Sequence, residues 1–199
     1  RERIGAARHV IVIGGGWIGL EVAATARQAG CEVTVLEAAS RACVRTVPES
    51  ISTWLEALHA GHGTRLRFGA RVESVAADDT AVRVQLAGAE EVVGDLLLLG
   101  IGMIANDGLA REAGLATDNG VLTDASGRTD DPRVFAVGDV ANALQADGQR
   151  RRVESWENAQ RMGAAAARAA LGKAPDPAHA GPPWFWSDQY EDNLQLLGL

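Results

Sequence analysis

The chain has 199 residues, of which 47% are hydrophobic and 23% charged, and its formal net charge is −7. This length is enough for one large domain, or one and a half small ones, with a hydrophobic core. The acidic balance argues against a nucleic-acid-binding protein, whose affinity depends on cationic contacts with phosphate. No apolar run approaches the roughly 20 residues that span a membrane.

The N-terminal part of the chain predicts a βαβ unit. We expect a buried strand over residues 9–13, a helix over 17–28 and a second strand over 32–36. A further helix is expected over 47–61, where a proline stands near the start and a glycine at the end.

Three strand-like segments follow, separated by short turns, at 65–77, 81–86 and 91–102. The middle of this stretch is expected to form antiparallel hairpins. The longest apolar run, 95–99, predicts a buried strand. A βαβ unit followed by a small antiparallel meander is a known elaboration of a doubly wound nucleotide-binding domain.

The composition changes after this meander. Residues 106–132, rich in Asp, Asn, Gly and Thr, predict a short helix and turns. Residues 133–139 predict another buried strand, and 156–171 predict a helix of mostly small residues. A linker rich in Pro, Ala and Gly covers 172–183, and 184–199 is expected to hold the first strand of a further domain.

Three glycines, Gly14, Gly16 and Gly19, follow the first strand and open the first helix. Gly14 permits a tight turn, Gly16 lets the backbone approach a pyrophosphate, and Gly19 lets helix and strand pack closely. Free N–H groups at the helix start would face the phosphates. Glu37 closes the next strand 37 − 19 = 18 residues later, near the spacing of a dinucleotide-binding motif. The alternative is a glycine-rich turn in an ordinary α/β core.

The acid at Glu37 favours NADH over NADPH. Its carboxylate would accept hydrogen bonds from both hydroxyls of an adenosine ribose and repel a 2′-phosphate. Arg41 and Arg45 lie just beyond this strand, and arginines at such positions can also bind a 2′-phosphate. The sequence therefore predicts NADH, with NADPH as the alternative.

The two cysteines, Cys31 and Cys43, do not form a C-x-x-C pair, so no dithiol redox centre is encoded locally. We expect both to be small hydrophobic residues in a reducing cytosol. His59 and His62 could face one metal ion, but the stretch reads as a helix end followed by a turn, and no third ligand is in view. We therefore expect no metal site.

Residues 129–139 match the pattern T-x-x-x-x-V-F-A-x-G-D. Gly138 would let a ligand come close, and the carboxylate of Asp139 would accept a hydrogen bond from a hydroxyl group. The alternative is a strand and turn with a solvated Asp. With its upstream glycine loop, the chain resembles the flavoprotein oxidoreductases with two dinucleotide-binding domains, which implies that Asp139 holds the ribityl chain of FAD.

The closer resemblance is to ferredoxin reductases that serve aromatic-ring dioxygenases and bacterial cytochromes P450. It rests on motifs at 14–21, 100–107, 153–160 and 183–190, the last two far more specific than a glycine loop, and it covers nearly the whole chain. The implied fold is α/β, with a doubly wound, Rossmann-like NAD domain that carries an antiparallel meander. The C-terminal half of an FAD domain and the first strand of an α+β C-terminal domain would follow.

The resemblance implies cofactor-binding residues and no catalytic side chain. Glu21 would orient the carboxamide of the nicotinamide, and Glu37 and Arg45 would hold the adenosine side. Residues around Ile101 would line the path of the nicotinamide, and Trp156 would lie against the flavin. The full set expected to bind the cofactors FAD and NADH is Gly14, Gly16, Ile18, Gly19, Glu21, Glu37, Arg45, Gly100, Ile101, Gly102, Asp139 and Trp156.

Elementary chemistry agrees with this reading at Ser155 and Trp156. Ser155 is a plausible N-cap, and a helix that starts there would point positive N–H groups at the pyrimidine edge of a reduced flavin. The alternative for Trp156 is a packed core aromatic residue. Trp184 and Trp186 would pack near the flavin by resemblance, or form a hydrophobic seam between domains.

The implied domains are an NAD(H)-binding domain over 1–106, the C-terminal part of an FAD domain over 107–178, and the start of a flavin-covering domain over 179–199. The resembling proteins begin with a glycine loop of their own, which binds the ADP half of FAD, and none precedes Arg8 in this sequence. We therefore expect an internal fragment that binds NADH and, with half of a flavin site, binds FAD poorly by itself.

For the complete protein, the resemblance implies a cytoplasmic enzyme that passes electrons from NADH through FAD to a 2Fe–2S ferredoxin. Arg150, Arg151 and Arg152 could form a docking patch for an acidic ferredoxin, or a solvated loop beside Asp147. One alternative is a related flavoprotein with another acceptor, such as rubredoxin, nitrite or monodehydroascorbate. Another is a non-catalytic, NADH-responsive flavoprotein of the apoptosis-inducing-factor type. We expect neither a nucleic acid nor a membrane as partner.

Overall fold

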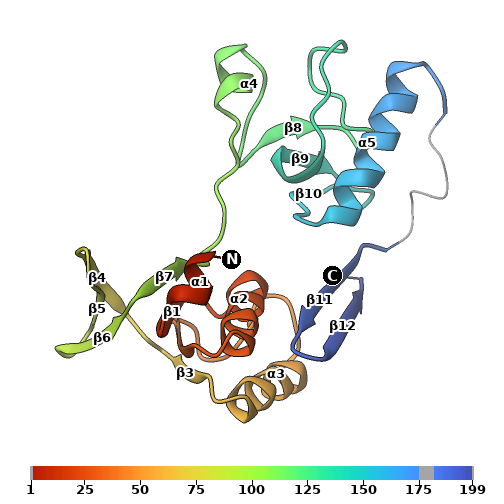
Figure 1. Cartoon of the computed structure of the whole chain (residues 1–199). Coiled ribbons are helices and arrows are strands. Elements are labelled where there is room, and N and C mark those ends of the chain that lie inside the picture. The colour runs from red at the N-terminus through yellow and green to blue at the C-terminus, as the bar shows by residue number, and fades with distance from the viewer. Residues whose placement is uncertain (1, 175–181, 199) are drawn as a thin grey trace. The chain divides into compact units, whose positions relative to one another are not determined.

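The computed structural model of the chain describes residues 2–174 and 182–198. They form two compact units. Of the described residues, the first unit comprises those within 1–102 and 187–194, and the second comprises those within 103–186 and 195–199. Figure 1 shows the helices and strands of each unit.

The first unit is built on a four-stranded parallel sheet with the order β3-β2-β1-β7. Its strands are β1 (His9–Ile13), β2 (Glu32–Glu37), β3 (Arg65–Phe68) and β7 (Leu96–Leu99). Helix α2 (Trp17–Gln28) connects β1 to β2, and α3 (Glu49–Gly61) connects β2 to β3. The predicted βαβ unit is therefore confirmed. A short helix, α1 (Glu2–Ala6), precedes it.

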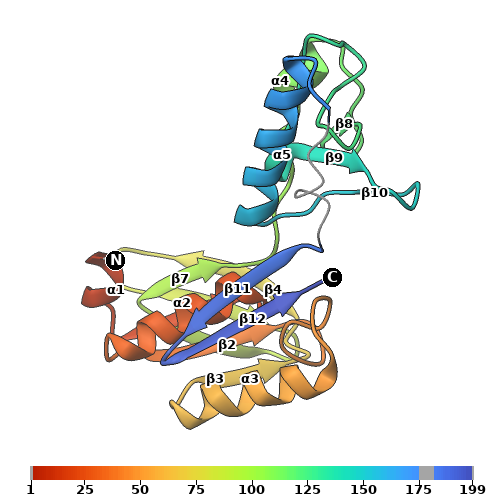
Figure 2. The same cartoon turned by 90° about the vertical axis from the view of Figure 1, so that its right-hand side faces the viewer.

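Different elements cover the two faces of this sheet, because successive side chains of a strand point to opposite faces. Val10 and Val12 of β1 pack with Ala23 of α2 on one face, and Figure 2 shows α2 lying across the sheet. Ile11 packs on the other face with Val84. Burial on both faces explains why the parallel strands are continuous apolar runs.

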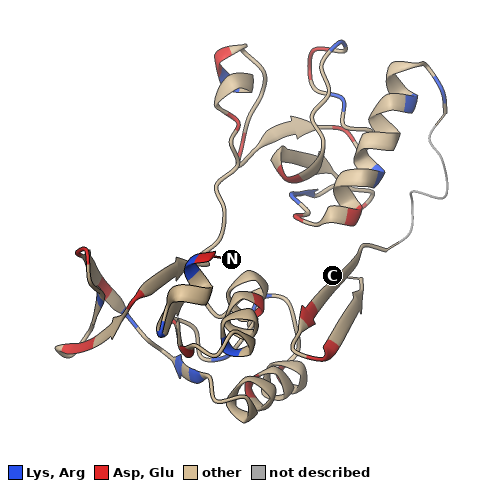
Figure 3. Ribbon diagram, viewed as in Figure 1, with Lys and Arg blue, Asp and Glu red and all other residues tan. Residues whose placement is uncertain are grey.

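The second face is covered by a separate antiparallel sheet, β4-β5-β6, as predicted. Its strands are β4 (Val72–Ala77), β5 (Val82–Leu86) and β6 (Glu90–Gly94). Segments 65–77 and 91–102 each contain two strands, one per sheet, rather than one long strand. In the first of them the chain turns at Gly69, which has a φ of 67°. Figure 3 shows acidic residues at both turns of the meander.

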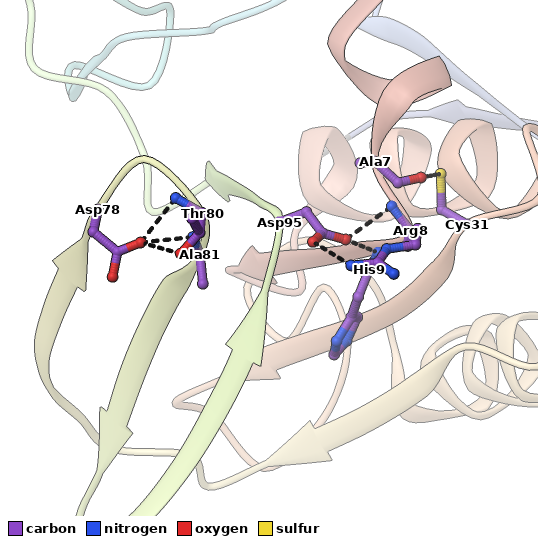
Figure 4. A network of polar contacts seen from close by, with 8 residues as sticks. All are labelled: Ala7, Arg8, His9, Cys31, Asp78, Thr80, Ala81 and Asp95. Carbon is purple, nitrogen blue, oxygen red and sulfur yellow. Dashed lines mark hydrogen bonds and ion pairs between the residues drawn. The ribbon is translucent and has the colours of Figure 1, made fainter.

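Asp95 ties the end of the meander to the start of β1 (Figure 4). Its Oδ2 accepts hydrogen bonds from the backbone N–H groups of His9, at 2.8 Å, and Arg8, at 2.9 Å. These bonds, above all the one from His9, hold the pKa of Asp95 below its usual range. Strand β7 follows directly. It is an edge strand, so it is only half-buried and Leu99 is exposed, which corrects the expectation of a buried strand.

The second unit contains a three-stranded sheet with the order β10-β9-β8. Its elements are α4 (Gly108–Glu112), β8 (Val121–Thr123), the 3₁₀ helix η1 (Gly138–Val140), β9 (Ala141–Leu144), β10 (Arg150–Arg151) and α5 (Trp156–Ala170). Ala141 and Ala143 of β9 pack against Met162 of α5. The predicted short helix and the predicted C-terminal helix are both confirmed.

Segment 133–139 does not form the buried strand that its apolar sequence predicts. Phe135 forms a single β-bridge, with Arg128, whose guanidinium lies 5.2 Å from the centre of the Phe135 ring. Val134 and Val137 are exposed. An apolar run becomes a buried strand only where a second backbone pairs with it and a further layer covers it. In the described residues this segment forms one bridge, and Ala136 packs, partly buried, against the cluster that contains Met162.

The last described segment is a hairpin rather than the single strand that was predicted. Strands β11 (Trp184–Gln189) and β12 (Asp192–Leu197) pair with each other. The chain reverses at Tyr190, which lies in the left-handed region with a φ of 57°. Of the predicted linker over 172–183, residues 175–181 lie outside the described residues.

Two kinds of feature are absent from the described ranges, 2–174 and 182–198. No helix there combines the length and the apolar composition that a membrane crossing requires. No group of three or more His, Cys, Asp or Glu side chains in those ranges is arranged to hold a metal ion.

Candidate functional site: a dinucleotide loop and its supports

The glycine loop after β1 is held by close backbone packing. Gly14 has a φ of 109°, and its N–H donates to the carbonyl oxygen of Leu36 at 2.8 Å. A Cβ atom on Gly14 would lie under 3.0 Å from the carbonyl oxygen of Gly100. A Cβ atom on Gly19 would also lie under 3.0 Å from its nearest neighbour, the carbonyl oxygen of Gly14. Three of the predicted glycines, Gly14, Gly19 and Gly100, therefore meet where β1 and β7 end and α2 begins.

Gly16 has a different role in this loop. It is the N-cap residue of α2, and as a glycine it has no side chain with which to cap the helix. A Cβ atom on Gly16 would meet no atom within 4 Å. Ile18, one residue into the helix, is exposed. The loop therefore presents open space beside the start of a helix, where backbone N–H groups and the helix dipole favour a pyrophosphate.

Glu37 lies beside this loop. Its Oε2 accepts a hydrogen bond from the N–H of Gly15 at 2.5 Å, and its Oε1 accepts one from the N–H of Ala39 at 2.7 Å. Each carboxylate oxygen has a further lone pair with which to accept a ribose hydroxyl. The backbone thus fixes the Glu37 carboxylate next to the glycine loop.

The two arginines beyond β2 differ in their surroundings. Arg41 donates from Nη1 to the carbonyl oxygen of Val47 at 2.9 Å and to Ser52 Oγ at 2.5 Å, and so holds the loop that follows β2. Arg45 is exposed, and within the described residues no hydrogen bond or ion pair engages it. Arg45, not Arg41, is free to contact the adenosine side of a nucleotide.

Glu21 has a partner that the sequence did not indicate. Ser187 Oγ of β11 donates a hydrogen bond to Glu21 Oε1 at 2.5 Å. The two residues are 166 positions apart in the chain, and no local pattern marks a serine in a strand as the partner of a helical glutamate. This contact belongs to the first unit.

Segment 100–102 leaves the end of β7. The N–H of Gly100 donates to the carbonyl oxygen of Ile13 at 2.7 Å, which anchors the segment to β1. The side chain of Ile101 is 69% exposed, and Gly102 has a φ of 101° with open space where a Cβ would stand. An exposed apolar side chain between two glycines provides a surface on which a flat ring can lie.

The second unit places the residues predicted to contact FAD. Gly138 has a φ of 70°, and a Cβ on it would lie 3.3 Å from the Cβ of Ala159 in α5. Asp139 follows in η1 and is exposed. Its backbone oxygen accepts a hydrogen bond from Arg152 Nη1 at 2.9 Å. The backbone of Asp139 is thus fixed while its carboxylate faces outward.

Helix α5 begins as predicted. Ser155 is its N-cap, and Ser155 Oγ accepts a hydrogen bond from the N–H of Asn158 at 3.2 Å. Trp156 is 60% exposed and meets Trp186 edge-on, with 5.7 Å between ring centres. Trp184 stacks on Trp186 at 5.0 Å. Trp156 is therefore not the core residue considered as the alternative, and its ring is available to a ligand.

All three arginines of the predicted docking patch make contacts within the chain. Arg150 Nη1 donates to the carbonyl oxygens of Thr123 and Asn142, at 2.9 and 3.0 Å. Arg151 pairs with Asp147 at 2.6 Å. Arg152 pairs with Glu154 at 2.6 Å, and its side chain is only 11% exposed. The three side chains are not equivalent, and Arg152 serves the fold of the second unit.

The cysteines and histidines are placed away from solvent or engaged by neighbours. Cys31 and Cys43 are free and buried, and Figure 4 shows Cys31 beside the carbonyl oxygen of Ala7. Burial raises the pKa of Cys43 to about 12. His59 is fully buried, and burial lowers its pKa from 6.5. These groups are suited to packing and hydrogen bonding rather than to nucleophilic chemistry.

The comparison with known sequences gives the family. The profile of the pyridine nucleotide-disulphide oxidoreductases matches residues 2–163, so the chain belongs to this family. Its members are FAD- and NAD(P)H-dependent oxidoreductases, in agreement with the cofactors expected from the sequence. The α/β architecture is also that of the family.

Solved structures provide a finer comparison. The ferredoxin reductase for the CYP199A2 system from Rhodopseudomonas palustris is 41% identical with a TM-score of 0.91, over 100% of this chain and 49% of that one. The covalent putidaredoxin reductase–putidaredoxin complex matches at 38% identity and a TM-score of 0.89, over 96% and 46%.

The water-forming NADH oxidase from Lactobacillus brevis, solved with bound NADH, matches at 27% identity and a TM-score of 0.78, over 88% of this chain and 39% of that one. The chain thus spans about half the length of the ferredoxin reductase structures. Oxidoreductase chemistry is common to all of these relatives.

Proposed function

We propose that this chain is the NADH-binding part, and part of the flavin-binding part, of an NADH-dependent flavoprotein that reduces a 2Fe–2S ferredoxin. The observation that carries the proposal is the 41% identity and TM-score of 0.91 to a ferredoxin reductase over the whole of this chain. Bound FAD supplies the chemistry, because it accepts a hydride and releases single electrons. The chain supplies binding, orientation and electrostatics.

In the first unit, the proposed ligand is NADH. The open space at Gly16 and the N-terminal end of α2 receive the pyrophosphate. Glu37 accepts the ribose hydroxyls and disfavours a 2′-phosphate. Glu21 and the segment at Ile101 contact the nicotinamide. We assign this role to residues 1–106.

In the second unit, the outward carboxylate of Asp139 binds the ribityl chain of FAD, and the start of α5 at Trp156 lies along the flavin. The fixed backbone of Asp139 and the exposure of Trp156 fit these roles. We assign this part of the flavin site to residues 107–178, and the start of the flavin-covering domain to 179–199.

The first test is nucleotide and flavin binding by the purified chain. Titration calorimetry should give a Kd for NADH at least about tenfold below that for NADPH, since an acid beside the ribose repels a 2′-phosphate. An absorption spectrum after incubation with FAD and desalting shows whether flavin is retained. If the chain binds neither nucleotide, the proposal is wrong.

The second test concerns the acceptor, in a protein that contains this chain and bound FAD. We expect NADH-dependent reduction of a 2Fe–2S ferredoxin to exceed that of rubredoxin, nitrite, monodehydroascorbate and oxygen. Oxygen is the second candidate because of the likeness to a water-forming NADH oxidase. Slow turnover with every acceptor and a long-lived complex of reduced flavin with NAD would instead indicate an NADH-responsive, non-catalytic protein.

A further inference from the structure

A continuous chain of hydrogen bonds runs from Glu21 into the interior of the first unit. Ser187 Oγ donates to Glu21 Oε1 at 2.5 Å, and Gln189 Nε2 donates to Ser187 Oγ at 3.0 Å. Gln189 Oε1 lies 2.7 Å from His59 Nε2. His59 Nδ1 lies 3.2 Å from the hydroxyl of Tyr190. Residues from α2, α3 and the β11–β12 hairpin are thus linked through side chains alone.

The direction of each bond follows from the carboxylate at its end. An ionised Glu21 only accepts, so the single hydroxyl hydrogen of Ser187 is committed to it. Ser187 Oγ can then only accept a hydrogen from Gln189, which requires the amide nitrogen of Gln189 to face it. The amide oxygen of Gln189 therefore accepts from Nε2–H of His59.

The state of His59 agrees with this order. A neutral imidazole with its hydrogen on Nε2 has an acceptor at Nδ1, which receives the hydroxyl hydrogen of Tyr190. Burial favours the neutral ring, since it lowers the pKa of His59. In this order every donor of the hydrogen-bond network points toward Glu21. The Tyr190 hydroxyl also lies 3.2 Å from Thr64 Oγ1, which can donate a hydrogen bond to it.

The hydrogen-bond network is shielded from solvent. His59, Ser187 and Gln189 are at most 2% exposed, so a broken link would leave a buried polar atom without a partner. The network consequently holds Glu21 by its Oε1 atom. Over the described residues, no hydrogen bond engages Glu21 Oε2, which leaves that oxygen to accept a bond from a ligand.

We propose that Ser187, supported by Gln189 and His59, is a positioning residue that presents Glu21 Oε2 to the carboxamide N–H of a nicotinamide. The inference rests on the proposed function, because it takes a nicotinamide dinucleotide as the ligand. It adds the β11–β12 hairpin to the determinants of ligand specificity. Ser187 does not touch the ligand and acts through Glu21.

The experiment compares two ligands that differ at one group. Reduced 3-acetylpyridine adenine dinucleotide has an acetyl group where NADH has the carboxamide, and so lacks the N–H donor. The wild-type chain should bind NADH about tenfold more tightly than the analogue, the range expected of one hydrogen bond to a charged acceptor. Titration calorimetry gives both Kd values, and circular dichroism confirms folding.

The variants separate positioning from general damage. Ser187→Ala should reduce the tenfold preference to about twofold, mainly by weakening NADH. Ser187→Thr keeps a hydroxyl and should restore most of the preference. Ser74→Ala, a matched change at an exposed serine of β4, should leave the preference unchanged.

The outcomes also separate this inference from the proposed function. If the wild type binds neither ligand, the proposed function fails. If the wild type shows the preference and folded Ser187→Ala retains it, the positioning inference is wrong. Should Ser187→Ala not fold, Gln189→Met removes the amide that orients the Ser187 hydroxyl. In the Gln189→Met variant we expect the preference for NADH over the acetylpyridine analogue to fall about threefold. An unchanged preference in that variant overturns the inference.

Discussion

Gly19 approaches Gly14 so closely that a Cβ atom on Gly19 would lie under 3.0 Å from the carbonyl oxygen of Gly14. Three residues earlier, a Cβ atom on Gly16 would meet no atom within 4 Å apart from those of its own chain neighbours. The same loop therefore uses glycine for two purposes. At Gly19 the small size permits backbone packing within the protein, and at Gly16 it leaves space for a ligand.

This contrast predicts two different effects of alanine. Gly19→Ala should lower the free energy of unfolding by about 2 kcal/mol or more, because the clash is with backbone that cannot move aside. Gly16→Ala should change it by less than about 1 kcal/mol but weaken NADH binding by about tenfold or more. Urea unfolding and calorimetry measure the two effects. Equal loss of stability in both variants would contradict the assignment.

Substitutions at Glu37 and at the two arginines beyond β2 test the preference for NADH over NADPH. Glu37→Gln removes the charge that repels a 2′-phosphate, so the preference for NADH over NADPH should fall by about tenfold. Adding Arg45→Ala should weaken NADPH binding by that variant, since Arg45 is exposed and able to reach the phosphate. Arg41→Ala should chiefly reduce the melting temperature, because Arg41 holds loop carbonyls. Kd ratios and thermal melts distinguish these outcomes.

His59 makes stability depend on pH. Its pKa is lowered from 6.5 in the folded chain, mainly by burial, so the unfolded chain takes up a proton first as the pH falls. Stability should therefore be highest above about pH 6.5 and decline below it. Next to the ring are Tyr190, His62 and the amide of Gln189. Urea unfolding at several pH values should show that the free energy of unfolding depends less steeply on pH in His59→Gln than in the wild type, and an unchanged dependence would contradict the role of His59.

The cysteines provide a test of burial. Cys31 and Cys43 are buried, and burial raises the pKa of Cys43 to about 12. A thiol reagent at pH 8 should modify neither within minutes in the native chain, because both thiols are shielded by burial and the reactive thiolate of Cys43 is also scarce. Both should react at once in guanidinium chloride. Rapid modification of the native chain would contradict the burial of these thiols.

Arg151 and Arg152 should respond differently to substitution by serine. Arg152 is largely buried, so Arg152→Ser should reduce stability by about 1–3 kcal/mol through the loss of its contacts to Glu154 and Asp139. Arg151 forms a half-exposed ion pair with Asp147, and its loss should cost less than about 1 kcal/mol. A slower ferredoxin reduction by Arg151→Ser, or a weaker salt dependence of that reaction, would therefore indicate that Arg151 takes part in docking. Thermal melts of the variant show whether it is still folded.

Local patterns in the sequence were enough for the βαβ unit, the glycine loop and the capped start of α5. Each depends on residues close together in the chain, such as Gly14 and Gly19 in one turn or Ser155 and Asn158 at one helix end. Sterics and hydrogen bonds over such short separations are the same in any context. The residue types therefore predicted these elements directly.

Tertiary structure decided the features that join distant segments. Segment 133–139 has the composition of a buried strand, but pairing and cover depend on what lies beside it. Segments 65–77 and 91–102 are divided between two sheets because different layers bury their two halves. Ser187 meets Glu21 across 166 positions of sequence, a contact created only when the hairpin packs on α2. Burial and partner choice are properties of the assembled chain, so no local pattern encodes them.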